Sequence, residues 1–418
     1  MIFLCDKNTD NVKKLQETIR ALGLDGKIVV LEDDGFLPNG ILSPYEYFVY
    51  CQTHNELVEK ELFFDFIEVP EYWRILLINS AVGGIYDMDT KKASIYFTVP
   101  YENRNVQRVE WHTEDGWVYK IDYYNKYGLK YAGEFRNREG GVDSKVYYSD
   151  RNQEVIVEQP QNGIITLLER GAVKNFFTSQ NQFINYYVKE AGLEDKYVLF
   201  VENEEQFKLL DFKPDGKSTW EFILFSEQAL LDKYIHMGGE NGYRFCAIPE
   251  SYPVNQAKGE ALILTASDRI EGVEELIQAL PEMIFHIAAN TQVSDKINRL
   301  GEQSNVKIYP QVSPQELEQL WGKCDFYLDI NHYREIYDAV NMAHWHNLLI
   351  MGFENTVHNK KVLVERLIFP EQGSRGMIVK IRETLNNPDI MEELLVEQQN
   401  NKFEIWKGAL ELLEKEEK

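Results

Sequence analysis

Hydrophobic and polar positions near the amino terminus alternate between strand and helix patterns. Short apolar runs predict strands at Ile2 to Leu4 and at Lys27 to Leu31, and the amphipathic stretch from Val12 to Leu22 predicts a helix between them. A helix that connects two buried strands is typical of a βαβ unit with a parallel sheet. We therefore expect the chain to begin as an α/β domain.

The pattern changes to a period of two residues from about Ile78 to Leu167. Apolar side chains at Ala93, Ile95 and Phe97 alternate with more polar ones, as half-buried strands require. Turn signals recur at Asp115-Gly116, Asn125 to Gly128, Gly140-Gly141 and Asn162-Gly163. This region is predicted to be an inserted, extended antiparallel β-meander that splits the first α/β domain.

Helix and strand patterns resume after the insert. They predict a helix near Gln180 to Ala191 and strands at Tyr197 to Val201, Trp220 to Phe225 and Tyr243 to Ile248. Beyond a polar linker, a second α/β series has predicted strands at Ala261 to Thr265, Met283 to Ala288, Val306 to Tyr309, Phe326 to Ile330 and Leu348 to Met351. Helices rich in Glu and Lys are expected from about Ile390 to Leu413.

These patterns predict an α/β protein with two Rossmann-like domains and an inserted β-sheet domain. We place the first Rossmann-like domain at residues 1–75 and 168–250, and the β-meander at 76–167. The second Rossmann-like domain is placed at 258–390, followed at 391–418 by helices.

Composition argues against several classes of protein. The 418 residues carry a formal net charge of -24, which disfavours nucleic-acid binding because phosphate contacts need clustered Lys and Arg. The apolar runs are strand-sized and far below the roughly 20 residues that a membrane-spanning helix needs. The amino terminus lacks a basic stretch followed by a long apolar region, so we expect a cytoplasmic protein. The scattered cysteines are expected to be reduced core residues: Cys5, Cys51, Cys246 and Cys324.

Residues Phe326 to Phe353 resemble the donor-binding segment of retaining two-domain glycosyltransferases of the GT-B type. In active members of that family, the turn and helix after this strand hold a Glu-x7-Glu pair whose carboxylates contact the sugar and the nucleotide ribose. That spacing falls on Tyr333 and Asn341 in this chain. Neither side chain is a carboxylate, so the resemblance implies a GT-B fold whose donor site is degenerate.

The loop after Thr265 gives a second indication. Active relatives place a lysine before the glycine of this loop, where its charge meets the sugar-nucleotide diphosphate. Here Glu271 precedes Gly272, and Asp268 lies nearby. Carboxylates repel a diphosphate, and Arg269 is only a shifted candidate to offset them. We therefore expect no nucleotide or other cofactor.

Other catalytic patterns are weak in this sequence. His332, His344 and His346 are close in sequence, but residues two apart on a helix point to different faces, so no metal site is expected. The chain has no Gly-x-Ser-x-Gly nucleophile elbow. Carboxylate pairs such as Asp33 and Asp34 are interpreted as solvated surface in so acidic a chain.

The order of the parts is similar to that of GtfB-type stabilising subunits of the two-subunit protein O-GlcNAc transferase in the accessory Sec system of Gram-positive bacteria. The matching stretches are residues 35–38 with 43–45, 261–272, 326–332 and 348–356 with His358. The resemblance implies a non-catalytic, chaperone-like subunit whose carboxyl-terminal helices cross back to the first domain. Its partner would be a catalytic subunit that transfers GlcNAc from UDP-GlcNAc to Ser and Thr of a serine-rich repeat adhesin before export. This chain would stabilise that partner and hold the unfolded adhesin polypeptide, with peripheral membrane association only through partners.

Two sets of contact residues follow as expectations. A serine-rich chain offers hydroxyls and backbone rather than apolar surface, so the candidates for an acceptor-binding cleft are Asn331, His332 and Asn341. The partner interface is expected on the inserted sheet. Its candidate residues are Tyr96, Tyr124, Tyr147 and Tyr148, for which an ordinary core role is the alternative.

A second function remains open at this point. The chain could be a divergent but active retaining glycosyltransferase that uses a UDP-sugar. In that case Glu335 or Asp338 would replace the missing carboxylates. Glu335 is two residues from the expected position, and errors of about 1 Å in placing a catalytic group already cost much of the rate.

Overall fold

The computed structural model describes residues 1–50, 57–193, 196–213 and 220–415, with side chains described as far as Trp406. Contacts divide the chain into two compact units. The first contains Met1–Val12, Asp25–Phe225 and Leu230–Tyr243, and the second contains Lys13–Leu24, Ser226–Ala229 and Arg244–Lys418.

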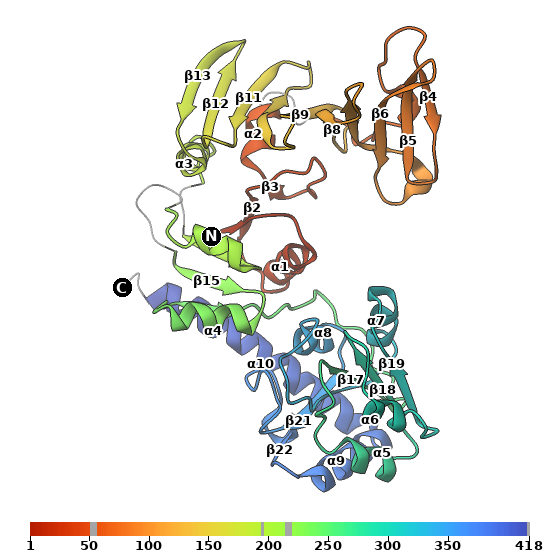
Figure 1. Cartoon of the computed structure of the whole chain (residues 1–418). Helices are drawn as coiled ribbons and strands as arrows, with labels where there is room; N and C mark the ends of the chain where they lie inside the picture. The colour runs from red at the N-terminus through yellow and green to blue at the C-terminus, as the bar shows by residue number, and fades with distance from the viewer. Residues whose placement is uncertain (51–56, 194–195, 214–219, 416–418) are drawn as a thin grey trace. The chain divides into compact units, whose positions relative to one another are not determined.

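A six-stranded sheet of the first unit has the order β16-β15-β14-β1-β2-β3 (Figure 1). Its strands are β1 (Ile2–Cys5), β2 (Lys27–Val30), β3 (Ile41–Leu42), β14 (Tyr197–Val201), β15 (Phe222–Phe225) and β16 (Gly242–Arg244). Pairs from β3 through β2, β1 and β14 to β15 are parallel. Every residue of β1, β14 and β15 is buried, which explains why these strands read as continuous apolar runs. The helices of this part are α2 (Pro44–Tyr50), α3 (Gln180–Glu190) and most of α4 (Gln228–His236), whereas α1 (Asp10–Ala21) belongs to the second unit from Lys13 onwards.

A ten-stranded antiparallel sheet fills the rest of the first unit, and its strands follow one another from β4 to β13. They are β4 (Arg74–Leu77), β5 (Val82–Asp87), β6 (Thr90–Phe97), β7 (Val106–His112), β8 (Val118–Tyr124), β9 (Lys130–Arg136), β10 (Val142–Tyr148), β11 (Glu154–Gln159), β12 (Ile164–Glu169) and β13 (Ala172–Phe177). The predicted antiparallel meander is confirmed. The two edge strands, β4 and β13, reach beyond the expected range of 76–167.

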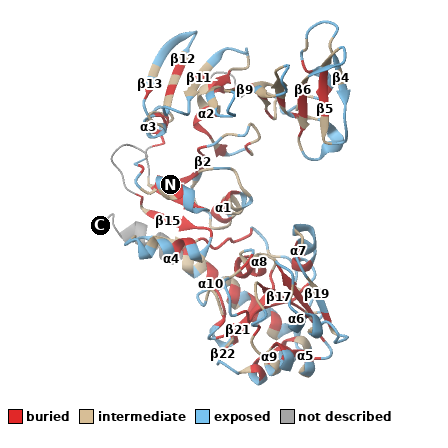
Figure 2. Cartoon of the chain, viewed as in Figure 1, coloured by how far each residue is buried: buried red, intermediate tan, exposed pale blue. Residues whose placement is uncertain are grey.

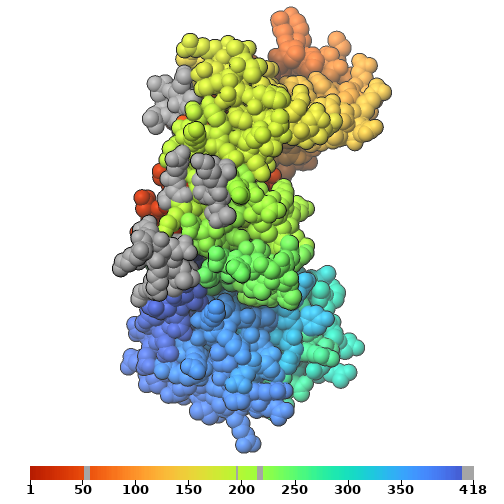
Figure 3. Space-filling model, turned by 90° about the vertical axis from the view of Figure 1, so that its left-hand side faces the viewer, coloured from red at the N-terminus to blue at the C-terminus, as the bar shows by residue number. Residues whose placement is uncertain are grey.

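Two separate cores support this sheet. One lies against β5 to β7, where the alternating residues Ala93, Ile95 and Phe97 are buried together with Phe64 of the short 3-10 helix η2 (Phe64–Phe66). The other lies where α2 and α3 cover β9 to β13. Figure 2 shows β5 and β6 as largely buried and the edge strand β4 as largely exposed. In the space-filling view, the side chains of β11 to β13 and α3, coloured yellow to yellow-green, form one continuous surface (Figure 3).

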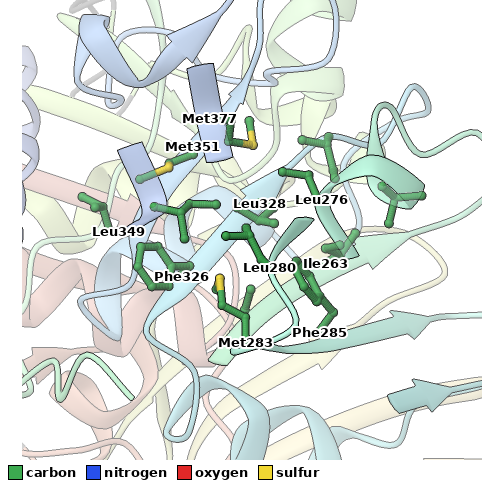
Figure 4. Packing of buried hydrophobic residues seen from close by; sticks show 14 of the residues in the cluster. Ile263, Leu276, Leu280, Met283, Phe285, Phe326, Leu328, Leu349, Met351 and Met377 are labelled. Carbon is green, nitrogen blue, oxygen red and sulfur yellow. The ribbon is translucent and has the colours of Figure 1, made fainter. Parts of the chain in front are cut away.

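The second unit contains a parallel six-stranded sheet of order β19-β18-β17-β20-β21-β22. Its strands are β17 (Glu260–Thr265), β18 (Ile284–Ala289), β19 (Val306–Tyr309), β20 (Phe326–Asp329), β21 (Leu349–Phe353) and β22 (Ile368–Phe369). Its helices are α5 (Val273–Ala279), α6 (Asp295–Leu300), α7 (Pro314–Trp321), α8 (Ala339–Trp345), α9 (Ser374–Asn386) and α10 (Pro388–Lys415). Figure 4 shows side chains of β17, β18, β20, β21, α5 and α9 packed into one apolar cluster.

Helix α10 is tied into the second unit by buried polar contacts as well as apolar ones. Gln398 accepts the backbone N–H of Ile350 at 2.9 Å and donates to the carbonyl of Leu348 at 2.9 Å. The indole of Trp406 donates to the carbonyl of Cys246 at 2.7 Å. That α10 also crosses back to the first domain stays a prediction.

Most predicted strands of the α/β parts are confirmed, and those at Tyr197 to Val201 and Val306 to Tyr309 have the predicted bounds. The strand predicted at Tyr243 to Ile248 is wrong in length, because β16 ends at Arg244. The following residues through Ile248 are buried, but their backbone bonds α1, α8 and α10 instead of a strand.

Two further predictions concern cysteines and membranes. Cys5, Cys246 and Cys324 are buried free thiols, and Cys51 lies outside the described residues. Among the helices that the structure describes, none has both the length and the apolar character needed to cross a bilayer.

Candidate functional site

The carboxyl ends of β17, β20 and β21 form the place where an open α/β sheet binds its ligands. The loops that follow β17 and β20 are joined by backbone hydrogen bonds from Glu271 to the carbonyl of Ile330 (2.8 Å) and from His332 to the carbonyl of Arg269 (3.1 Å). This pairing extends the sheet by an antiparallel bridge between Ile270 and Asn331. The two loops therefore act as one rigid rim.

Asp329 ends β20 with a fully buried carboxylate. One of its oxygens lies 2.6 Å from Nδ1 of His358, and the other accepts the backbone N–H of His358 at 2.7 Å. Nε2 of the same ring lies 2.6 Å from the carbonyl oxygen of Tyr333. Both ring nitrogens face acceptors, so the geometry requires a doubly protonated, positively charged imidazolium.

The pKa of His358 agrees with that assignment. Burial alone would lower this pKa, but the hydrogen bond and negative charge of Asp329, together with the carbonyl of Tyr333, raise it to about 9. Burial raises the pKa of the Asp329 carboxyl, and the bonds from His358 oppose that rise. We assign the pair as carboxylate and imidazolium at neutral pH.

Glu271 and His332 form a second pair on the rim, with Oε2 and Nε2 at 2.6 Å. Glu271 thus occupies the position where the resemblance places a lysine, and its carboxylate is directed to a histidine. The next residue, Gly272, has a φ of 61°, and a Cβ atom there would come within 2.6 Å of Oγ of Ser374. The loop therefore requires glycine for its packing, whether or not a diphosphate binds.

Arg244 forms the third charged group, with Glu335 and Asp338. Its guanidinium bonds Oε2 of Glu335 at 3.1 Å and Oδ1 of Asp338, and the arginine side chain is only 7% exposed. Burial raises the pKa of Asp338 to about 6, while Arg244 opposes the rise, so the carboxyl remains ionised at neutral pH. Glu335 also accepts the backbone N–H of Val340 in the first turn of α8 at 2.8 Å.

The structure changes the interpretation of two predicted acceptor residues. Asn331 and Asn341 are each 2% exposed. The amide of Asn331 bonds Thr265 and the turn after it, and that of Asn341 donates to the carbonyl of Phe245 at 2.8 Å. Both side chains are buried and bond within the protein, and their role in acceptor binding stays a prediction. His332 is partly exposed, and its role stays a prediction.

The two positions where the resemblance places the donor-binding carboxylates, Tyr333 and Asn341, differ in exposure. Tyr333 is 59% exposed on the rim, whereas Asn341 is buried in α8. The residues that organise the site were not predicted: Arg244, Asp329 and His358. An aspartate at the end of the apolar run Phe326 to Ile330 was a usable signal, because a charge in a buried strand needs a partner. In the described part of the chain, no group of His, Cys, Asp and Glu is arranged to hold a metal ion.

Two of the four predicted interface tyrosines are not on an exposed face. Tyr147 and Tyr148 are 3% and 8% exposed. Tyr147 packs in the core against Tyr45, and the ring of Tyr148 lies 4.6 Å from the ammonium of Lys130. The prediction of exposure is therefore wrong for these two, while Tyr96 and Tyr124 are half-buried and stay candidates.

Other exposed apolar side chains of the sheet lie along edge strand β4 and in the segments beside it. Leu76 and Leu77 of β4 are 45% and 40% exposed, and Ile78 follows at 47%. Phe66, Tyr72 and Met88 are 74%, 86% and 79% exposed, and the side chain of Arg74 in β4 donates to the carbonyl of Met88. We call these six apolar residues the β4 patch.

Three family models match the chain. They are described as the GtfB N-terminal domain over residues 2–48, the GtfB middle domain over residues 73–178 and the GftB/GlyA-F C-terminal domain over residues 261–398. The matches fall on the three sheets described above.

Two relatives that match most of the chain carry the same protein name. The UDP-N-acetylglucosamine–peptide N-acetylglucosaminyltransferase stabilizing protein GtfB of Streptococcus parasanguinis is 34% identical over 389 residues, which are 86% of this chain and 87% of the relative. The protein of that name from Limosilactobacillus reuteri subsp. suis is 32% identical over 88% of both chains.

Solved structures extend the comparison to the fold. A chain in the crystal structure of a GtfA/B complex bound to UDP and GlcNAc is 27% identical and covers 96% of both chains, with a TM-score of 0.56. The pneumococcal O-GlcNAc transferase GtfA, solved with UDP and GlcNAc, has a TM-score of 0.56 at 13% identity over 99% of both chains, which shows the fold alone. The predicted GT-B fold is confirmed.

His358→Gln tests the imidazolium. A histidine whose folded pKa is raised contributes stability below its unfolded pKa of about 6.5 and loses it as the pH rises towards 9. We expect wild type to exceed the variant by roughly 3 kcal/mol in unfolding free energy at pH 6, with a gap that narrows up to pH 9. Urea unfolding at several pH values measures the gap. A double variant that adds Asp329→Asn has neither charged partner, so its own unfolding free energy should not fall between pH 6 and pH 9 as that of wild type does. A difference between wild type and His358→Gln that stays constant with pH would contradict the imidazolium assignment.

Arg244→Met tests the buried triad. Removal of the guanidinium leaves the carboxylates of Glu335 and Asp338 without their counter-ion, which should cost about 3–5 kcal/mol of stability at pH 7. Adding Glu335→Gln and Asp338→Asn should recover much of the loss, because the amides need no counter-ion. Urea unfolding of wild type, Arg244→Met and the triple variant measures the three unfolding free energies. Equal stability of wild type and Arg244→Met would show that the triad is not a structural unit.

Proposed function

Because the chain belongs to the GtfB family of stabilizing proteins, we propose that it is the non-catalytic stabilising subunit of a UDP-GlcNAc–peptide N-acetylglucosaminyltransferase. Its partner is a catalytic GT-B subunit like the GtfA of the solved GtfA/B complexes. The chain holds the unfolded, serine-rich acceptor polypeptide while the partner transfers GlcNAc. This work takes place in the cytoplasm before the acceptor is exported, with any membrane contact made through partners.

The observation that carries the non-catalytic part of the proposal is the Arg244 triad. Glu335 and Asp338 are the two carboxylates that a divergent active site would use, and both are bound to one buried guanidinium. A catalytic carboxylate must contact the donor sugar or hold a proton for it. Carboxylates that already neutralise a buried cation serve the fold instead.

The other carboxylates of the site are occupied in the same way. Asp329 bonds His358, and Glu271 bonds His332. The loop after β17 adds a further acidic residue to the rim, Asp268. Donor binding therefore has little electrostatic support, because each added phosphate charge would meet acidic side chains.

The β4 patch supports the pairing with a catalytic subunit. An edge strand has unpaired N–H and C=O groups, and an exposed apolar edge invites another chain to cover it. The opposite edge strand, β13, also exposes two large apolar side chains, Val173 and Phe176, but it includes Lys174, a residue typical of protected edges. The β4 patch, by contrast, adds four exposed apolar residues beside its strand. We therefore assign the catalytic subunit to the β4 side of the sheet.

The absence of an independent activity is a direct prediction. The isolated chain, mixed with UDP-GlcNAc labelled in the sugar and an unglycosylated serine-rich peptide, should transfer no label, and addition of the catalytic subunit should start transfer. Glu335→Gln should leave the rate of the complex within about twofold of wild type. A divergent enzyme would lose roughly 10²-fold or more with that change. Transfer by the isolated chain would overturn the non-catalytic proposal.

Leu76→Lys tests the partner surface. A charge in the middle of the β4 patch should weaken binding of the catalytic subunit at least tenfold, equivalent to about 1.4 kcal/mol. Surface plasmon resonance with immobilised catalytic subunit measures the affinity. The matched control is Val173→Lys on the other edge of the same sheet, which should bind like wild type. The reverse result, a loss only with Val173→Lys, would move the interface to β13.

A further inference from the structure

A cavity of about 420 Å³ lies in the first unit, where the carboxyl end of β2 meets the ten-stranded sheet and the first turn of α3. We propose that this cavity is a subsite for an extended segment of the acceptor polypeptide, whose serine hydroxyls and backbone N–H groups it receives. The inference rests on the proposed function and deepens it, because it names the place and the chemistry of acceptor binding.

The cavity is built by elements that are distant in sequence but adjacent in the fold (Figure 1). Its floor and walls come from the loop after β2, from α2, from strands β10 to β12 and from the start of α3. Residues from these parts include Asp33, Tyr45, Lys145, Glu158 and Gln180. The volume falls in the range of about 300–1,000 Å³ that is usual for ligand sites. The end of β2 is also an edge where α/β sheets bind ligands.

The walls are held by contacts that do not depend on a ligand. The rings of Tyr45 and Tyr147 stack at 4.5 Å between centroids, and the hydroxyl of Tyr45 donates to Glu158 at 2.5 Å. The ammonium of Lys145 lies 5.0 Å from the centre of the Tyr147 ring. Tyr45 and Tyr147 are 5% and 3% exposed, so they form rigid walls and offer no open ring face to a sugar. A rigid site loses less conformational entropy when it binds.

The charges of the lining select against anions. Glu32, Asp33 and Glu158 supply three carboxylates, and Lys145 supplies one cation. A nucleoside diphosphate would be repelled by that balance. Ionised carboxylates only accept hydrogen bonds, so the complementary ligand is neutral and rich in donors. A serine-rich segment has this character, since each residue carries a hydroxyl and a backbone N–H.

Asp33 is the acceptor that matters most. Its carboxylate accepts a hydrogen bond from the backbone N–H of Gly35 at 2.7 Å. Within the described part of the chain, the Asp33 side chain makes no second hydrogen bond. Burial, with the charges of Glu46 and Asp34, raises the pKa of Asp33 to about 7 against the opposing effects of the Gly35 hydrogen bond and Lys145. Asp33 is thus half-buried, whereas Asp34 is exposed. Donors from a bound polypeptide would replace the solvation that this carboxylate has lost.

The test is titration of the full-length chain, alone and in complex with the catalytic subunit, with an unglycosylated serine-rich peptide at pH 8. Asp33→Asn keeps the size of the side chain and an acceptor for Gly35, so the variant should fold. We expect it to bind the peptide at least fivefold more weakly, because bonds to an ionised acceptor are about twice as strong as neutral ones. The matched control is Asp34→Asn, an exposed neighbour outside the cavity lining, which should bind within twofold of wild type.

The outcomes separate the subsite from the function on which it rests. Peptide binding that is equal in wild type and Asp33→Asn would overturn the subsite and leave an acceptor-holding subunit in place. No peptide binding by wild type, alone or in the complex, would overturn acceptor holding itself. Free GlcNAc that displaces the peptide from wild type but not from Asp33→Asn would identify a sugar as the occupant and overturn the assignment to polypeptide.

Discussion

A carboxylate without exposed surface can persist in a strand only if a counter-charge and hydrogen bonds replace its water, and Asp329 meets this constraint through His358. The pair fixes more than two side chains. The other nitrogen of the His358 ring lies 2.6 Å from the carbonyl of Tyr333, so the loop after β20 is tied to the loop after β21. The loop after β20 is in turn bonded to the one after β17. One buried ion pair thus helps to join the loops after three neighbouring strands, β17, β20 and β21.

The same constraint applies to the polar side chains at the start of α8. The amide of Asn341 donates to the backbone carbonyl of Phe245 and to Asp338. Arg244 then neutralises Glu335 and Asp338. Each of these groups is bonded within the protein. The polar side chains of the site therefore stabilise the fold.

The sequence predicts this fold well because its elements are set by local periodicity. Continuous apolar runs identify the parallel strands, and period two identifies the meander. The site was predicted less well, since its contacts join residues far apart in the chain, such as Asn341 and Phe245 or Asp329 and His358. Tyr147 and Tyr148 show a further limit: alternation places one of two neighbours on the outer face, but both are buried, and the register shifts between them. Bulges and long-range polar partners leave little trace in a single sequence.

Stabilisation in such a complex must act in both directions. A partner that binds only the folded chain stabilises it by about 2.7 kcal/mol when its concentration is a hundred times the dissociation constant, and thermodynamic linkage makes the benefit mutual. The β4 patch gives this statement a structural basis, because an uncovered apolar edge strand favours aggregation until another surface covers it. Strands β10 to β12 of the same sheet line part of the cavity, and they belong to the same unit as β4. A single inserted sheet would thus connect the two roles of the subunit, since the framework that receives the catalytic partner also builds one wall of the acceptor site.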